Sequence, residues 1–117
     1  MKLAITVWDE RIAPVFDAAH SLLIADIKNQ IIKYIAHESF NPLFEARFIG
    51  KLNHLHIDVF ICGAISQTHS TLIEANGIQL IPFISGSVNE ILESYARGQS
   101  LTPAFLMPGC REDSSLV

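Results

Sequence analysis

Apolar residues occur along the chain in short runs and at helical spacings, and this pattern predicts a succession of strands and helices. Five runs have the length and composition of strands buried in a sheet. They cover residues 2–7, 21–27, 31–37, 57–62 and 78–83. Only Lys28-Asn29-Gln30 separates the second run from the third, so its turn chemistry and short length predict a hairpin.

The first helix is predicted to begin at Asn41-Pro42, because asparagine can cap a helix and proline suits its first position. Its inner face is predicted from apolar residues at helical spacing. These residues are Leu43, Phe44, Phe48, Leu52 and Leu55.

Capping residues mark the other two helices. Ser66 or Thr68 can cap a helix that ends at Asn76-Gly77, a pair suited to the left-handed conformation after a helix. Ser87, with Glu90 three residues later, fits a capping box and predicts the last helix.

The resulting order, β-β-β-α-β-α-β-α, has a leading hairpin followed by crossover units. It predicts an α/β fold with a mixed sheet, parallel strands at its centre and helices on both faces. We expect one domain over residues 1–100. Residues 101–117 show no clear period, so we expect a C-terminal tail that is partly disordered.

Three predicted loops follow strand ends, at residues 8–15, 63–67 and 84–87. They could converge at one edge of the sheet. Crevices at the carboxyl ends of strands are the usual ligand sites of open α/β sheets, so we expect the functional site there.

Composition narrows the classes of function. The chain has 117 residues, half of them hydrophobic and 17% charged, which suits one domain with a substantial core. A formal charge of -4 and the lack of a basic run argue against nucleic acid as a partner. The apolar run before Trp8 is too short for a signal peptide or a membrane span, so we expect a cytoplasmic protein without a membrane partner.

The chain has two cysteines, Cys62 and Cys110, and we expect both to be free thiols. Cys62 ends a predicted buried strand. A partly exposed thiol beside Gly63 would let a bulky ligand approach the backbone, whereas the alternative is a small buried hydrophobic residue. Cys110 lies in a turn-rich tail and could supply a second soft ligand if the tail folds back to the crevice.

Two further positions near the strand ends could contact an anion. Arg11, in a loop with Asp9, could pair with an anionic ligand such as a carboxylate through a bidentate fork. The alternative is a solvated loop with a weak surface ion pair. Gly86 precedes a capped helix and offers free backbone N–H groups, although it could equally serve only as a turn. No nucleophile–base pair or carboxylate cluster is evident, so we expect no catalytic residue and no enzyme.

Several segments in this order carry a family likeness. They are residues 11–17, 58–65, 77–83 and 86–98, after the first predicted strand. Together they resemble the dinitrogenase iron–molybdenum cofactor biosynthesis family, in particular its small single-domain members related to NifX and to the C-terminal part of NifB. The likeness covers roughly residues 1–100.

The resemblance implies a ribonuclease H-like fold and a non-catalytic role. Such a domain would hold or carry an iron–sulfur or iron–molybdenum cluster or its precursor, with cluster-biosynthesis proteins as partners. The candidate binding residues are then Asp9, Arg11, Cys62, Gly63, Ala64 and Gly86, with Cys62 and Cys110 as metal ligands.

One departure from the family pattern concerns the first loop. Members that bind the cofactor commonly carry His-Phe-Gly there, whereas this chain has Val15-Phe16-Asp17. His20 could substitute, but a surface or structural histidine is the better interpretation. Two hypotheses follow: a cluster carrier, or a non-metal module that binds a small anion or a protein after losing its cluster function. We expect a monomer or a weak homodimer formed through the edge of the leading hairpin.

Overall fold

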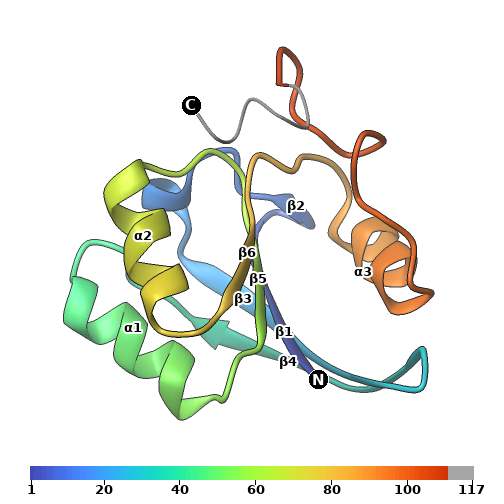
Figure 1. The fold of residues 1–117 in the computed structure, drawn as a ribbon, viewed down its shortest axis with the longest axis horizontal. Coiled ribbons are helices and arrows are strands. Elements are labelled where there is room, and N and C mark those ends of the chain that lie inside the picture. The colour runs from blue at the N-terminus through green and yellow to red at the C-terminus, as the bar shows by residue number, and fades with distance from the viewer. Residues whose placement is uncertain (111–117) are drawn as a thin grey trace.

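A computed structural model describes residues 1–110 as one mixed sheet with helices packed on it (Figure 1). The strands are β1 (Lys2–Trp8), β2 (Arg11–Ile12), β3 (Ser21–Lys28), β4 (Ile31–Ser39), β5 (Val59–Ile61) and β6 (Gln79–Ile81). The helices are α1 (Glu45–His54), α2 (Gln67–Ala75) and α3 (Val88–Ala96), and a short 3-10 turn covers Phe16–Ala18.

The strand order in the sheet is β4-β3-β1-β5-β6, with the short β2 paired to β1. β3 pairs antiparallel with both β1 and β4, whereas β1, β5 and β6 run parallel to one another. Helices α1 and α2 cover one face and α3 covers the other, as Figure 1 shows. The predicted mixed sheet with helices on both faces is confirmed, while the ribonuclease H-like label stays a prediction.

Alternation along the strands divides the apolar residues between two cores. Successive side chains of a strand point to opposite faces, so Leu3 and Ile5 of β1 pack towards α3, whereas Ala4 packs towards α1 and α2. Phe16 occupies the second core, where its ring lies 5.3 Å from that of Phe48 between centroids. The 3-10 turn is therefore anchored by a buried aromatic side chain.

The predicted caps of α2 and α3 are confirmed. The Ser66 hydroxyl accepts a hydrogen bond from the His69 N–H at 3.2 Å, and the Ser87 hydroxyl accepts one from the Glu90 N–H at 3.4 Å. Each bond satisfies one of the N–H groups that a helix leaves without a partner in its first turn. Both helices therefore begin where the sequence places them.

The predicted start of α1 is wrong. The Asn41 side chain accepts a hydrogen bond from the Leu43 N–H at 3.1 Å, and this local turn competes with helical bonding. The helix begins at Glu45 instead, and Leu43 and Phe44 are exposed rather than part of the inner face. Only the later residues of that predicted face, Phe48 and Leu52, are buried.

Residues 101–110, the first part of the predicted tail, are held by contacts with the rest of the chain. Leu101 is buried against the α3 core, and the Ser85 N–H donates to the Phe105 carbonyl at 2.8 Å. The Met107 N–H also donates to the Phe83 carbonyl at 2.8 Å. Bonds between loops hold this segment, and such bonds leave no period in the sequence. The predicted disorder falls on residues 111–117, which lie outside the described residues.

β4 forms an edge of the sheet and exposes Ile31, Tyr34 and Ile35. Nothing within residues 1–110 pairs with its outer side, so the expected weak homodimer stays a prediction. In the same range, no helix is long and apolar enough to cross a membrane.

Candidate functional site

The loops that follow β1 and β5 are joined by backbone hydrogen bonds. The Ala64 N–H donates to the Pro14 carbonyl at 2.9 Å, and the Phe16 N–H donates to the Ala64 carbonyl at 2.8 Å. Val15 and Ala64 thus extend the parallel pairing beyond the named strands. Both backbone polar groups of Ala64, a predicted binding residue, are used by the protein itself.

The loop after β6 joins the same assembly. The Ile12 N–H donates to the Gly86 carbonyl at 3.0 Å, and the Val88 N–H donates to the Glu10 carbonyl at 3.1 Å. The expected convergence of three loops is therefore confirmed. We call the surface built by residues 8–17, 63–66, 83–87 and 105–110 the strand-end face; its loops lie above the sheet in Figure 1.

Gly63 lies at the closest contact within the strand-end face. A Cβ atom at this position would stand 2.5 Å from both the Ala13 and Pro14 carbonyl oxygens. Only glycine allows the two backbones to approach so closely. The expectation that Gly63 leaves room for a cluster is wrong, because the backbone of residues 13–14 fills that space.

Cys62 is buried, with no exposed surface, and packs in the core beneath α1 and α2. It continues the alternation of β5, so its side chain points to the same face as that of Phe60. Burial raises the pKa of the Cys62 thiol well above its ordinary value, which disfavours the thiolate that binds metals. The expected partly exposed thiol is therefore wrong, and the alternative of a small buried hydrophobic residue is confirmed.

Arg11 and Asp9 lie on the exposed hairpin between β1 and β2. Asp9 and Glu10 form its turn with φ angles of 57° and 69°, in the left-handed region. Arg11 is exposed and makes no ion pair within residues 1–110, so the expected surface pair with Asp9 or Glu10 is absent there. A hollow of about 280 Å³ lined by Trp8, Asp9, Arg11, Ile12 and Pro14 lies beside its guanidinium group.

Gly86 is mainly a turn residue. Its φ of 124° is strained for any other residue, and a Cβ atom there would meet the Phe105 ring at 3.5 Å. Two N–H groups at the start of α3 already have partners, since Val88 donates to Glu10 and Glu90 donates to Ser87. The prediction that N–H groups are free at this helix start is therefore wrong for Val88 and Glu90.

His69, which sequence analysis did not select, lies beside the loop position where the family histidine is missing. Its Nδ1 atom is 3.4 Å from a carboxylate oxygen of Asp17 and 3.1 Å from the Ser66 hydroxyl. Its ring stands 5.0 Å from that of Phe16 between centroids. One feature of the sequence could have identified His69: it lies three residues after the predicted cap, Ser66. This spacing directs its side chain back towards the cap.

The contacts of His69 differ from those of the histidine in a catalytic nucleophile–histidine–carboxylate arrangement. In such an arrangement the nucleophile and the orienting carboxylate bind opposite ring nitrogens of histidine. Here Ser66 and Asp17 both approach Nδ1, and the Ser66 hydroxyl also accepts the cap bond. His20, the suggested substitute for the missing imidazole, is exposed on the surface.

Possible metal ligands are sparse in the described part of the chain. No group of three or more His, Cys, Asp or Glu residues there is arranged to hold a metal ion. Cys110 has a free thiol and is half-buried. Its backbone N–H donates to the Met107 carbonyl at 3.0 Å, which closes a turn. Because the Met107 N–H donates to the Phe83 carbonyl, this turn is joined to the loop after β6 and forms part of the strand-end face, so the tail folds back to the strand ends.

The chain matches a known protein family over most of its length. The sequence model described as "Dinitrogenase iron-molybdenum cofactor" matches residues 1–98. The chain belongs to this family. The match covers β1 through α3 and therefore most of the strand-end face.

Solved structures share the fold of this family member. One is titled "Crystal structure of PH0822", at 13% identity and a TM-score of 0.77, covering 85% of this chain and 91% of that one. A "putative dinitrogenase" from Methanocaldococcus jannaschii has 19% identity and a TM-score of 0.67, covering 85% and 90%. A "putative NifB protein" from Thermotoga has 15% identity and a TM-score of 0.65, covering 84% and 89%. No curated protein matches the chain significantly.

The contact at Gly63 generates a test of the assembled loops. We expect Gly63→Ala to lower the free energy of unfolding by about 3 kcal/mol, because the new methyl group meets rigid backbone rather than a flexible side chain. Gly50→Ala is the matched control, because Gly50 is exposed in α1 and a Cβ atom there would meet no other atom within 4 Å. This substitution should raise the free energy of unfolding by about 0.5–1 kcal/mol. Urea unfolding measures both, and equal midpoints for the two variants would contradict the contact.

Burial of the Cys62 thiol predicts a pH dependence of stability. The folded chain keeps this thiol protonated, whereas the unfolded chain loses the proton above the ordinary cysteine pKa of about 8.5. The free energy of unfolding therefore falls as pH rises past that value, by at most about 1.4 kcal/mol per pH unit from this group. Urea unfolding between about pH 8.5 and pH 10 should show a shallower fall for Cys62→Ala than for the wild type.

Cys110→Ala is the matched control for this experiment, because its side chain is only half-buried. It should keep the wild-type slope. A shallower slope in Cys110→Ala, with Cys62→Ala unchanged, would refute the assignment of the buried thiol.

Proposed function

We propose that this chain is a non-catalytic carrier module for an anionic iron–sulfur or iron–molybdenum cluster, or its precursor, which rests on the strand-end face. Membership of the iron–molybdenum cofactor family over residues 1–98 supports the proposal most strongly. The cluster is cargo, received from one cluster-biosynthesis protein and passed to another. A carrier of this kind needs contacts that hold the cargo and then release it.

The charge at Arg11 suits such a cargo. The guanidinium group is exposed beside a hollow and has no ion-pair partner within residues 1–110, so it is free to form charge-assisted hydrogen bonds with an anion. Asp9 and Glu10 flank it on the same hairpin, and their negative charge lowers the affinity for an anionic cargo. Modest affinity favours handover over permanent storage.

Cys110 is the thiol that we assign to the cargo. It is half-buried in the turn of residues 107–110, which forms part of the strand-end face, whereas Cys62 is enclosed in the core. A thiolate is the soft ligand that iron–sulfur clusters prefer. One protein thiolate and one cation leave most of the cluster open to the ligands of a partner protein.

A second candidate function is a module that binds a small oxoanion or a protein without any metal. The enclosed thiol of Cys62 and the absence of a three-residue metal group within residues 1–110 favour it. In this case the same exposed Arg11 would bind the anion.

Anaerobic reconstitution with ferrous iron and sulfide tests the carrier function. We expect the wild type to gain the visible absorption of an iron–sulfur cluster and to keep it through gel filtration. Cys110→Ser should lose that absorption, while Cys62→Ala, which removes the other thiol, should retain it. Arg11→Gln should bind the cluster about fivefold more weakly, as expected for the loss of one exposed ion pair. Arg47→Gln, which changes an exposed arginine of α1, should bind the cluster as the wild type does.

The result also separates the two candidate functions. A folded wild type that acquires no absorption would rule out the cluster carrier. Calorimetric titration with molybdate and phosphate would then show binding that depends on Arg11 if the oxoanion module is correct.

A further inference from the structure

A second hollow lies outside the strand-end face, between the sheet and the C-terminal end of α3. Its volume is about 650 Å³, against about 180 and 280 Å³ for the hollows on the strand-end face. Cavities of this size commonly bind small molecules. The β3–β4 turn, β6 and residues 95–102 line it, and no residue of the strand-end face takes part.

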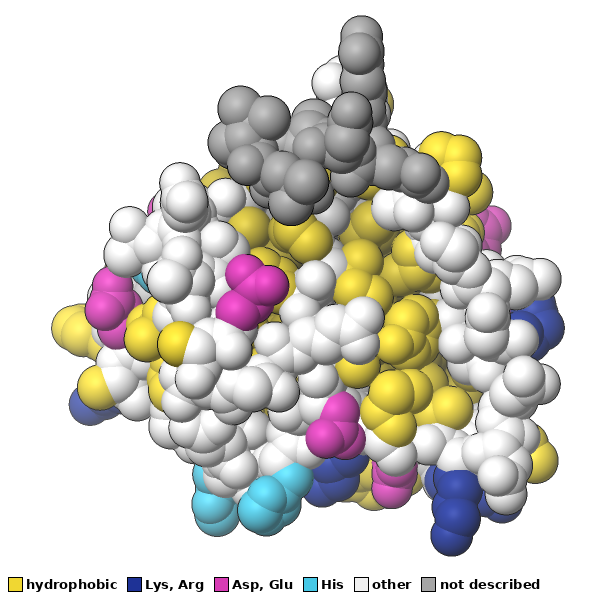
Figure 2. All heavy atoms as spheres, viewed as in Figure 1, with side chains coloured by type: hydrophobic (Ala, Val, Ile, Leu, Met, Phe, Trp, Pro, Cys, Tyr) yellow, Lys and Arg dark blue, Asp and Glu magenta, His cyan; other side chains and the backbone are white. Residues whose placement is uncertain are grey.

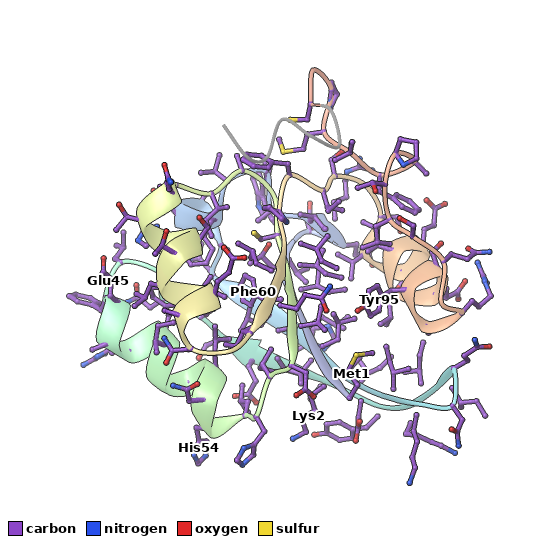
Figure 3. All side chains as sticks on the ribbon, in the orientation of Figure 1. Met1, Lys2, Glu45, His54, Phe60 and Tyr95 are labelled. Atoms are coloured by element: carbon purple, nitrogen blue, oxygen red, sulfur yellow. The ribbon has the colours of Figure 1, made fainter. Side chains whose placement is uncertain are left out.

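The floor of this hollow is apolar. Ile27, Ile81 and Leu101 line it together with the half-buried ring of Tyr95. Figure 2 shows hydrophobic side chains gathered in the depression between the sheet and α3. Figure 3 places Tyr95 and Met1 in the space between α3 and the sheet, so a flat ring could lie against the tyrosine.

The rim of the hollow is polar but carries no charged side chain. Its carboxamides are Asn29, Gln30, Gln79 and Gln99. Within residues 1–110 none of these four side chains hydrogen bonds to the protein, so each keeps its donors and its acceptor for a ligand.

The electrostatics of the lining exclude a charged ligand in the interior of the hollow. The ammonium group of Met1 is the nearby cation, and it already donates to the Ile27 carbonyl at 3.0 Å and pairs with Asp26 at 3.5 Å. A charged group buried in this hollow would lose its water without gaining an opposite charge. The ligand is therefore uncharged where it contacts the protein.

The backbone at the mouth of the hollow adopts the left-handed region at two positions. Asn29 and Gln30 form the β3–β4 turn with φ angles of 54° and 64°. Asparagine tolerates this region and glycine favours it, whereas glutamine adopts it at a cost. The Gln30 side chain extends towards α3, where its amide nitrogen would lie 3.4 Å from a Cβ atom on Gly98. A strained residue that reaches over a cavity is typical of a binding site.

We propose that this hollow binds an uncharged, nitrogen-rich heterocycle, such as a nucleobase or its nucleoside. The flat ring packs against Tyr95 and the apolar floor. The amide-like edge of the ring, which has donors and acceptors side by side, bonds to the carboxamides of Gln30, Gln79 and Gln99. This site is independent of the cluster proposed for the strand-end face, so either assignment stands without the other.

Titration of the isotope-labelled full chain with adenosine and uridine, followed by amide NMR shifts, tests the proposal. We expect at least one nucleoside to bind at millimolar concentration or below, with shifts confined to residues 27–31, 79–81 and 95–102. Adenosine monophosphate should bind severalfold more weakly than adenosine. Absence of binding, shifts centred elsewhere, or equal binding of the charged nucleotide would each overturn the proposal.

Two variants separate binding from folding. Tyr95→Leu should weaken binding about tenfold by removing the ring against which the heterocycle packs, while Tyr34→Leu, on exposed β4, should bind as the wild type does. Gln30→Gly should raise the urea midpoint, because it relieves the turn, and should at the same time weaken binding. Unchanged binding in both Tyr95→Leu and Gln30→Gly would overturn the proposal, because these residues would then be structural only.

Discussion

The close approach of Gly63 to the carbonyl groups of Ala13 and Pro14 organises the functional end of this protein. It allows Ala64 to pair with Val15, and this pairing continues the parallel β1–β5 register beyond the named strands. The same loop then turns Phe16 into the aromatic core and leaves Arg11 on the surface. Side chains in this region are therefore positioned by a contact between two backbones.

This contact also determines which chemistry the strand-end face can perform. An open crevice would expose the end of β5, but here the loop of residues 13–16 covers it and encloses Cys62. Groups that can reach a cargo are those on the outside of the loops, chiefly Arg11 and the half-buried Cys110. The proposed cargo would therefore be held at the edge of this surface rather than enclosed by the protein.

Local signals explain which elements could be predicted. Alternation and apolar runs located the strands, and the hydroxyls of Ser66 and Ser87 located two helix starts, because those interactions span only a few residues. The start of α1 was mispredicted because Asn41 serves equally well as a cap or as a turn residue, and its bond to Leu43 selects the turn. Residues 101–110 carry no local signal, since their order comes from bonds to residues 83–85.

Periodicity and motif order are properties of the chain, and they predicted the mixed sheet, the family and the order of the elements apart from the short β2. Packing, by contrast, encloses Cys62, brings His69 beside Asp17 and forms the largest of the hollows described above away from the strand-end face. Each of these facts depends on segments that are remote in sequence. Burial, pKa and cavity shape are set by the neighbours that packing supplies, and a residue's own surroundings in the chain do not specify them.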